Sequence, residues 1–192
     1  MVTPTFDISE SRRVRSIRTA RTDGECLRYR LDVVAASAAD AVHSAGGWLY
    51  DRAMAGWQVT VLLPHSCDTR PLQILGVGAI DLASGFDRTD SAAHSLAVSA
   101  EVFTADERIR ETVLKARNHR LTEVALWGDG WPLVVNRGMA RVQHVLSAAA
   151  RRFKRHALVA AGMCCDTVDP TEMMLYDMAA CSPADFELVR LG

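Results

Sequence analysis

The residues of this 192-residue chain that could do chemistry lie in a few short groups, and the densest is His65-Ser66-Cys67-Asp68. A histidine near a cysteine can lower the pKa of the thiol and make it a nucleophile, and histidine, cysteine and aspartate can bind metals. Residues so close together on a loop rarely face one another in the geometry that either role requires. We favour the simpler interpretation that a polar loop follows a strand here.

Two adjacent cysteines, Cys164 and Cys165, form the second group. Adjacent residues of an extended segment point to opposite faces, so these two cannot readily bind one metal ion together. A single thiolate here, near His65 or Cys67, is the strongest hypothesis for a thiol enzyme, although cysteine is also a common small buried residue. The catalytic candidates are therefore His65, Cys67, Cys164 and Cys165. We predict no metal site and leave the cofactor open.

An alternation of strands and helices would position these groups. Residues 27–34 and 58–63 have strand patterns, and the apolar residues between them recur at spacings of three and four, as in a helix. Ser37 is placed to cap this helix and Gly56 to end it. Because helical crossovers join parallel strands, this unit predicts a parallel sheet.

The same alternation continues to the end of the chain. Residues 72–82 could instead form a hairpin with the preceding strand, and residues 183–191 fit either a helix or an edge strand. Residues 83–94 are predicted to form a loop. Further strands are predicted at 77–82, 95–102, 121–127 and 157–161, and further helices from Asp68 or Thr69, from Thr104, over 139–153 and from Asp169.

This pattern predicts an α/β fold: a three-layer, Rossmann-like, mostly parallel sheet of about six strands with helices on both faces. Such sheets bind ligands at the carboxyl ends of their strands, where the strand order reverses. The carboxylates at predicted strand ends include Glu101, and two of them could form an acid–base pair or a divalent-cation site. The ligand-binding candidates are Ser37, Ser66, Asp68, Asp81, Asp129 and Asp166.

Two glycines, Gly46 and Gly47, interrupt the first helix, where each costs about 1 kcal/mol relative to alanine. They could allow a ligand to approach, but close packing beside Trp48 is the interpretation we favour. Phosphate-binding glycines belong instead at the turn from strand to helix. That turn, residues 35–38, contains none, so the sequence lacks a Walker or dinucleotide-binding motif.

Charge is distributed unevenly, although the net charge is −1. Residues 1–25 are predicted to form a mobile, Arg-rich arm, and residues 26–192 a single α/β domain with an acidic C-terminal helical segment. A basic helix over 137–155 could bind phosphates, or it could be a solvated face that meets the acidic tail or a partner subunit. Its anion-binding candidates are Arg137, Arg141, Arg151 and Arg155.

Composition favours a cytoplasmic globular protein, because no apolar run approaches the ~20 residues that span a bilayer and the N-terminus lacks a signal-peptide pattern. The main hypothesis is a non-catalytic regulatory or interaction protein that binds an anionic small ligand. The alternative is a small transferase or hydrolase that uses a strand-end thiol or carboxylates. A second alternative is nucleic-acid association through the arm and the basic helix, which a pI near 6.6 disfavours. A protein partner or homo-oligomer is also expected, and no membrane association.

Overall fold

The structure, a computed structural model, describes residues 29–64, 67–89, 95–118, 122–164, 166–177 and 188–190. Its strands are Arg30–Val34 (β1), Gln58–Leu63 (β2), Gly78–Asp81 (β3), Ser95–Ser99 (β4), Glu123–Trp127 (β5), Met139–Val145 (β6), Thr171–Asp177 (β7) and Leu188–Arg190 (β8). Its helices are Ala38–Met54 (α1), Arg70–Ile74 (α2), Leu82–Thr89 (α3), Ala100–Ala105 (α4), Glu107–Asn118 (α5), Leu133–Asn136 (α6) and Ala148–Ala160 (α7).

Within these residues, eight strands form one sheet in the order β3-β2-β1-β4-β5-β7-β6-β8. The strands from β3 to β5 are parallel, whereas β7 is antiparallel to β5 and β6, and β8 is antiparallel to β6. The strand order reverses between β1 and β4, because β2 and β3 add on one side of β1 and β4 and β5 on the other. The predicted α/β, mostly parallel sheet is confirmed, with eight described strands in place of about six.

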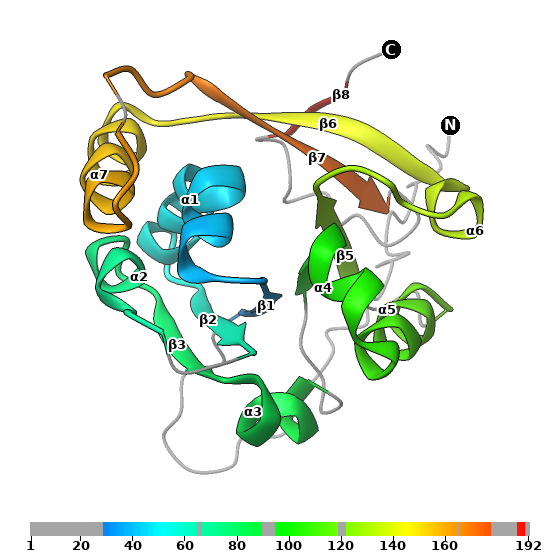
Figure 1. The fold of residues 1–192 in the computed structure, drawn as a ribbon. Coiled ribbons are helices and arrows are strands. Elements are labelled where there is room, and N and C mark those ends of the chain that lie inside the picture. Colours follow the sequence, from blue (N-terminus) through cyan, green and yellow to red (C-terminus); the bar gives the residue numbers. More distant parts are fainter. Residues whose placement is uncertain are drawn as a thin grey trace, which may run out of the picture.

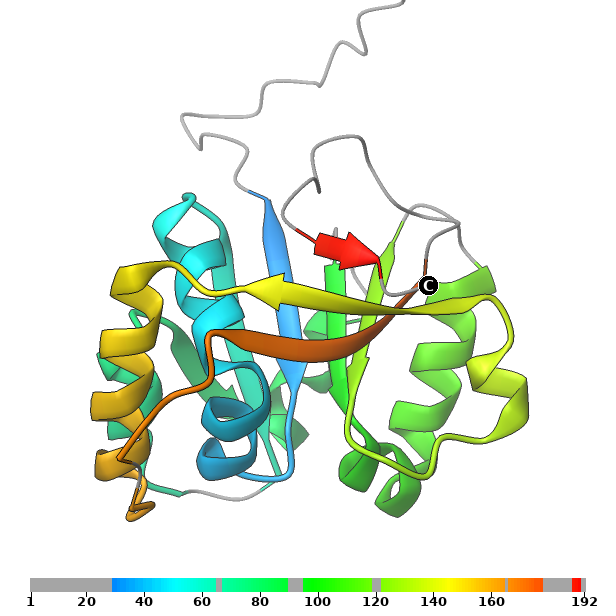
Figure 2. The same cartoon turned by 90° about the horizontal axis from the view of Figure 1, so that it is seen from above.

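Helices cover both faces of this sheet (Figure 1). α1, α2 and α7 pack on one face, and α3, α4 and α5 pack on the other. Neighbouring residues of a strand point to opposite faces, so Val33 belongs to the first core and Val34 to the second. Figure 2 shows β6 and β7 running across the molecule between α7 at one end and α6 at the other.

The opening unit of the chain folds as predicted. The Ser37 hydroxyl accepts a hydrogen bond from the Asp40 N–H at 3.0 Å, and the Asp40 carboxylate accepts one from the Ala36 N–H at 3.1 Å. These two bonds fix the turn from β1 into α1. Gly56 follows the end of α1 at φ +91°, a left-handed conformation that favours glycine. β3 is parallel to β2, so the alternative hairpin is wrong.

The region between β3 and α5 differs from prediction. The predicted loop at 83–94 contains most of α3, and the predicted strand at 95–102 is shorter because α4 begins at Ala100. A short apolar run fits a buried strand or a buried helix equally well. Residues 95–102 therefore contain one of each.

Thr104 does not cap α5, contrary to prediction. It lies inside α4, where its hydroxyl donates a hydrogen bond to the Ala100 carbonyl at 2.8 Å. Asp106 caps α5 instead, since its carboxylate accepts a hydrogen bond from the Arg108 N–H at 2.9 Å. Hydrogen bonds from the Arg108 side chain hold the pKa of Asp106 below its ordinary value.

The C-terminal half departs most from prediction. The predicted helix at 139–153 is β6 followed by α7, so no single basic helix spans 137–155. The predicted strand at 157–161 belongs mostly to α7, and the helix predicted from Asp169 is replaced by β7. The ambiguous C-terminal segment contains a strand, β8. Residues 1–25 lie outside the described residues, and the division into arm and domain stays a prediction.

Buried polar residues explain why β6 and β7 were predicted as helices. In β6, His144 is 2% exposed, and its Nε2 lies 3.0 Å from Asp51 Oδ2. In β7, Glu172 takes an inward position and is 4% exposed. A strand is recognised by alternating apolar and polar residues, and a polar residue on the inward side hides that alternation.

Glu172 belongs to a clamp that joins β7 and α7 to the middle of α1. Its two carboxylate oxygens accept hydrogen bonds from the N–H groups of Gly47 and Trp48, each at 2.8 Å. Lys154 Nζ lies 2.5 Å from Glu172 Oε1 and 2.7 Å from the His43 carbonyl oxygen. We call this set the Glu172–Lys154 clamp. It compensates both buried charges within the protein.

The glycine pair in α1 is explained by packing, the interpretation that the sequence favours. A Cβ on Gly47 would lie 2.3 Å from Leu146 Cδ2, which is too close for two carbon atoms. A Cβ on Gly46 would lie 3.4 Å from Leu75 Cδ1 and Val42 Cγ1. Lack of space therefore requires glycine at position 47 and not at position 46.

Gly47→Ala is expected to lower the free energy of unfolding by about 1–3 kcal/mol, because the new methyl group overlaps the buried Leu146 side chain. The matched control is Gly46→Ala, which has room for its methyl group and gains at most about 1 kcal/mol of helix propensity. Equilibrium urea unfolding measures both. Equal stability of the two variants would contradict the packing explanation.

Glu172→Gln is expected to cost about 3–5 kcal/mol of stability, because Lys154 would stay buried without a carboxylate. Glu111→Gln, at an exposed position of α5, is the control and is expected to change stability by less than about 0.5 kcal/mol. Thermal and urea unfolding provide the comparison. If the two variants lose the same stability, the clamp does not hold the fold together.

Candidate functional site

Three pockets meet at the end of β5, where the chain passes through Trp127, Gly128 and Asp129. Their volumes are about 580, 500 and 420 Å³, and Gly128 lines all three. Gly128 has φ +88°, and a Cβ on it would lie 3.0 Å from the Cβ of Ala100, at the start of α4. Glycine therefore lets the end of β5 pass close to α4.

The first pocket, of about 500 Å³, lies where the strand order reverses, and we call it the switch-point pocket. Its three carboxylates follow three different strands, β1, β4 and β5. Open α/β sheets bind ligands at this position. The lining residues are Asp40, Ser99, Ala100, Glu101, Thr104, Ala105, Gly128 and Asp129.

Asp40 is a fixed wall of this pocket, because hydrogen bonds occupy both of its carboxylate oxygens. Oδ2 accepts from the Ala36 N–H at 3.1 Å, and Oδ1 accepts from Trp127 Nε1 at 3.0 Å. The Ser44 hydroxyl donates to Oδ1 at 3.4 Å. Asp40 therefore joins the end of β5 to the start of α1.

Glu101 and Asp129 are open to the pocket. Both are exposed, and within the described part of the chain neither carboxylate has a hydrogen-bond or ion-pair partner. Unoccupied carboxylates in one pocket can accept a proton and return it during a reaction. These two are the groups in the switch-point pocket best suited to acid–base chemistry.

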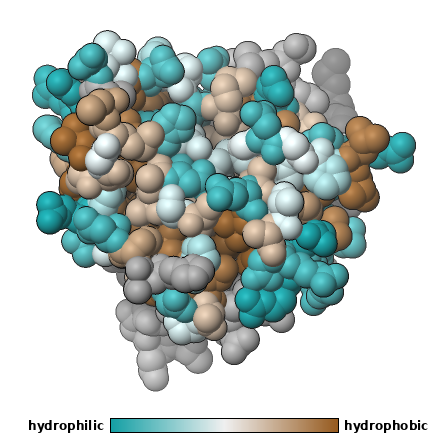
Figure 3. Space-filling view, in the orientation of Figure 1, coloured by the Kyte–Doolittle hydropathy of each residue, from teal (hydrophilic) through white to brown (hydrophobic). Residues whose placement is uncertain are grey.

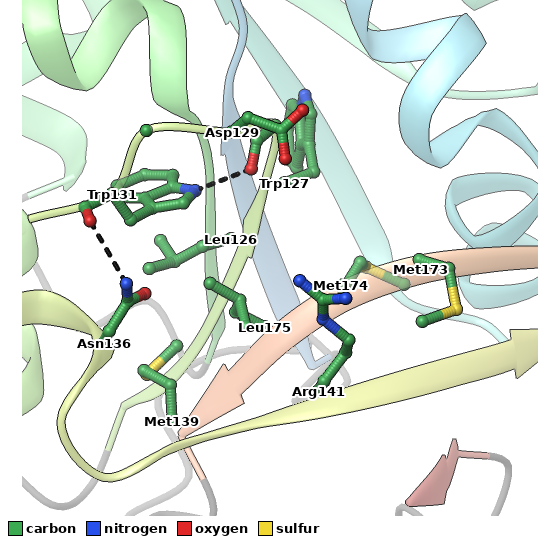
Figure 4. Close-up of a pocket in the computed structure, with 12 residues that line it drawn as sticks. Leu126, Trp127, Asp129, Trp131, Asn136, Met139, Arg141, Met173, Met174 and Leu175 are labelled. Atoms are coloured by element: carbon green, nitrogen blue, oxygen red, sulfur yellow. Dashed lines mark hydrogen bonds between the residues drawn. The ribbon is translucent and has the colours of Figure 1, made fainter. Parts of the chain in front are cut away.

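The second pocket, of about 580 Å³, is the Arg141 pocket (Figure 4). It shares Asp129 with the switch-point pocket. Leu126, Leu175 and Arg141 lie in one row across β5, β7 and β6, and so they share a face of the sheet. The other lining residues are Trp127, Gly128, Asp129, Gly130, Trp131, Asn136, Met139, Met173 and Met174.

The third pocket, of about 420 Å³, is the Lys154 pocket on the side of α1 and α7. Two of its charged residues, Lys154 and Glu172, are occupied by the Glu172–Lys154 clamp. His43 and Asp169 are the exposed titratable residues that line it. The buried charges of this pocket stabilise the fold, so Lys154 and Glu172 are less available to bind a ligand or to react with one.

The predicted ligand-binding residues come together only in part. Asp129 lines the switch-point pocket, and Ser37 caps the helix that carries Asp40. Asp68 accepts a hydrogen bond from the N–H of Arg70 at the start of α2.

The remaining candidates of this group lie elsewhere. Asp81 accepts hydrogen bonds from the N–H groups of Ala83 and Ser84 at the start of α3. Asp166 is exposed in the segment that follows α7. As ligand-binding residues, both stay predictions.

Of the predicted thiols, the two that the structure describes, Cys67 and Cys164, do not line the switch-point pocket. Cys67 and Cys164 are exposed, in the segments after β2 and after α7. Cys164 does not follow a strand, because the predicted strand before it belongs to α7. His65, Ser66 and Cys165 lie outside the described residues.

The four predicted anion-binding arginines do not share a helix face. Arg137 follows α6, Arg141 lies in β6, and Arg151 and Arg155 lie in α7. A spacing of three or four residues aligns side chains only within one helix. All four are exposed, and Arg141 lines the pocket named after it.

Sequence reasoning missed Asp40, Ser99 and His43 as pocket residues. Asp40 has the pattern of a capping acid, and Ser99 lies inside a predicted strand. Asp40 lies shortly after β1, and Ser99 is the last residue of β4. Knowledge that the strand order reverses between β1 and β4 would therefore have identified both residues.

No helix of the described residues is long and apolar enough to cross a membrane. Within the same residues, no group of three or more histidine, cysteine, aspartate or glutamate side chains is placed to hold a metal ion.

No family model matches the chain, and no curated protein sequence matches it. Solved structures of deacetylases are similar to it in fold. A pseudoaglycone deacetylase of an antimicrobial reagent has a TM-score of 0.52 and 15% identity, covering 81% of this chain and 99% of its own. A deacetylase of the teicoplanin biosynthesis pathway, solved with teicoplanin, has a TM-score of 0.52 and 13% identity, covering 84% and 98%.

These comparisons correct the main functional hypothesis from the sequence. A non-catalytic regulatory or interaction protein is contradicted, because the two similar solved structures reported above are deacetylases, which are hydrolases. The alternative of a small hydrolase fits them better. At 15% and 13% identity, the similarity to these structures shows the α/β fold alone.

Asp40→Ala is expected to lower the free energy of unfolding by about 1–3 kcal/mol, because Trp127 Nε1 and the Ala36 N–H lose their acceptor. Asp129→Ala is the matched control. Its carboxylate is exposed, and a change within about 0.5 kcal/mol is expected. Urea unfolding followed by tryptophan fluorescence distinguishes the two. A stable Asp40→Ala variant would show that this hydrogen bond does not anchor β5.

Proposed function

We propose that this chain is a small hydrolase that removes an acyl group from a small-molecule substrate. The observation that carries the proposal is the position of Glu101 and Asp129, two unoccupied carboxylates that line one pocket where the strand order reverses. The two deacetylases that share the fold support this class of reaction. A cytoplasmic location is part of the proposal.

The reaction uses the two carboxyl groups as acid and base. One of them, as a carboxylate, takes a proton from water while the water oxygen attacks the carbonyl carbon of the acyl group. The other, in its protonated form, gives a proton to the leaving nitrogen or oxygen as its bond to the acyl carbon breaks. The products are a carboxylic acid and an amine or alcohol. Asp40 is a positioning residue, because its carboxylate oxygens accept hydrogen bonds from Trp127 Nε1 and the Ala36 N–H.

The carboxylate form of the hydrolase is better supported than the thiol form. Cys67 and Cys164 do not line the switch-point pocket, whereas Glu101 and Asp129 do. The nucleic-acid alternative loses one of its two supports, since residues 137–155 form a strand and a helix in place of one basic helix. A small molecule is therefore the partner we propose.

Glu101→Gln and Asp129→Asn are each expected to lower kcat/KM for acetate release by about 100-fold or more, because general acid–base groups contribute about 10²–10⁴-fold. Acetate released from N-acetyl and O-acetyl compounds is measured by proton NMR. Unchanged thermal unfolding shows that the loss is not a folding defect.

The matched controls for this experiment are Cys67→Ala and Cys164→Ala, which are expected to keep the activity. Loss of activity in either cysteine variant, with full activity in both carboxylate variants, would favour the thiol form and contradict the carboxylate mechanism.

A further inference from the structure

The Arg141 pocket contains two charges of opposite sign, Arg141 and Asp129. Figure 4 shows the Arg141 side chain reaching from β6 into the pocket. Within the described part of the chain, Arg141 has no hydrogen-bond or ion-pair partner, and it forms no ion pair with Asp129. A guanidinium that faces a pocket without a partner is available to an anion.

The wall of this pocket is held in place by the protein. Trp131 Nε1 donates to the Gly128 carbonyl at 3.1 Å, and the Asn136 amide donates to the Trp131 carbonyl at 3.1 Å. The Trp131 ring packs on Phe103 of α4 with 4.9 Å between centroids. The chain between β5 and β6 therefore has its shape before a ligand arrives.

Arg117 of α5 holds the same segment from outside the pocket. Its guanidinium donates to the carbonyls of Val134 and Arg137 at 3.0 and 2.5 Å, and its Nε donates to Asp177 at 3.4 Å. The geometry thus assigns different roles to two arginines. Arg117 is fully engaged in structure, and Arg141 is free to bind.

The chain between β5 and β6 also carries an exposed apolar surface on α6. Leu133 is 81% exposed and Val134 is 64% exposed, and Figure 3 shows this apolar surface in brown at the right edge of the molecule. Within the pocket, Met139 and Leu175 add apolar side chains. The apolar residues that line the pocket with Arg141 therefore suit a ligand that has an apolar part and one anionic group.

We infer that the substrate of the proposed hydrolase is an anionic N-acyl compound, and that Arg141 binds its carboxylate or phosphate group. This inference rests on the proposed function. Asp129 lines both pockets, so a substrate anchored at Arg141 extends toward Glu101 and Asp129. Hydrolysis of an amide frees an amine, which takes up a proton in water, and the carboxylates of the switch-point pocket attract that cation.

Two pairs of probes test the inference on the full chain. N-acetyl-L-methionine is compared with its neutral amide, and N-acetylglucosamine 6-phosphate with N-acetylglucosamine. Each pair differs in the anionic group, and the two pairs distinguish a carboxylate from a phosphate. Binding is measured by NMR titration of the ¹⁵N-labelled protein, so the readout does not depend on turnover.

Arg141→Gln is expected to weaken binding of the anionic probes by about tenfold or more, because a charge-assisted hydrogen bond is lost. The neutral probes are expected to bind the variant and the natural protein equally. Arg152→Gln, at an exposed position of α7, is the matched control and is expected to bind all probes like the natural protein.

The inference is overturned if Arg141→Gln binds both anionic probes normally, if each neutral probe binds as tightly as its anionic counterpart, or if no probe binds. Charge-dependent binding at Arg141 in a protein that releases no acetate would leave the anion site standing and refute the hydrolase. If Arg141→Gln released acetate from anionic and neutral substrates as fast as the natural protein does, the anion site would be refuted and the hydrolase would stand.

Discussion

The hydrogen bond from Trp127 Nε1 to Asp40 Oδ1 is the contact on which the site depends, because it joins the end of β5 to the start of α1 across the reversal of strand order. The two residues are 87 positions apart in the chain. The carboxyl ends of the parallel strands lie at the same edge of the sheet. At this edge, the hydrogen bond joins the end of β5 to the first turn of α1. Gly128 and Asp129, which follow Trp127, are thereby placed between the pockets.

The three pockets share an edge but differ in how their charges are used. In the Lys154 pocket, the clamp pairs Lys154 with Glu172, and the buried charges stabilise the packing of α7 and β7 on α1. In the switch-point pocket, Asp40 is occupied by hydrogen bonds, whereas Glu101 and Asp129 are open. Charges that the protein satisfies hold the fold, and those that it leaves open are available for chemistry.

The sequence predicts the first part of the fold well and the last part poorly, for a physical reason. From β1 to β3, each element shows its own period, and Ser37 and Gly56 mark the limits of α1. In β6 and β7, the inward positions include His144 and Glu172. These polar side chains can be buried because they interact with Asp51 and Lys154, respectively. Such partners are distant in sequence, so local patterns cannot reveal them.

The candidate site was predictable only in part for a related reason. Asp129 could be placed at a strand end, but its neighbours there depend on strand order, which local pattern does not determine. Asp40 has the pattern of a capping acid, and it does help fix the turn into α1. Its second role, as the acceptor for Trp127, follows from the position of β5 in the sheet.

The chain has four tryptophans, and their positions make the central claim testable in one measurement. Trp127 and Trp131 line the Arg141 pocket, whereas Trp48 and Trp57 stack with Arg52 on the side of α1. If ligands bind at the end of β5, titration with N-acetyl-L-methionine shifts the indole NMR signals of Trp127 and Trp131 and leaves those of Trp48 and Trp57 in place. Shifts at Trp48 and Trp57 alone would contradict this account.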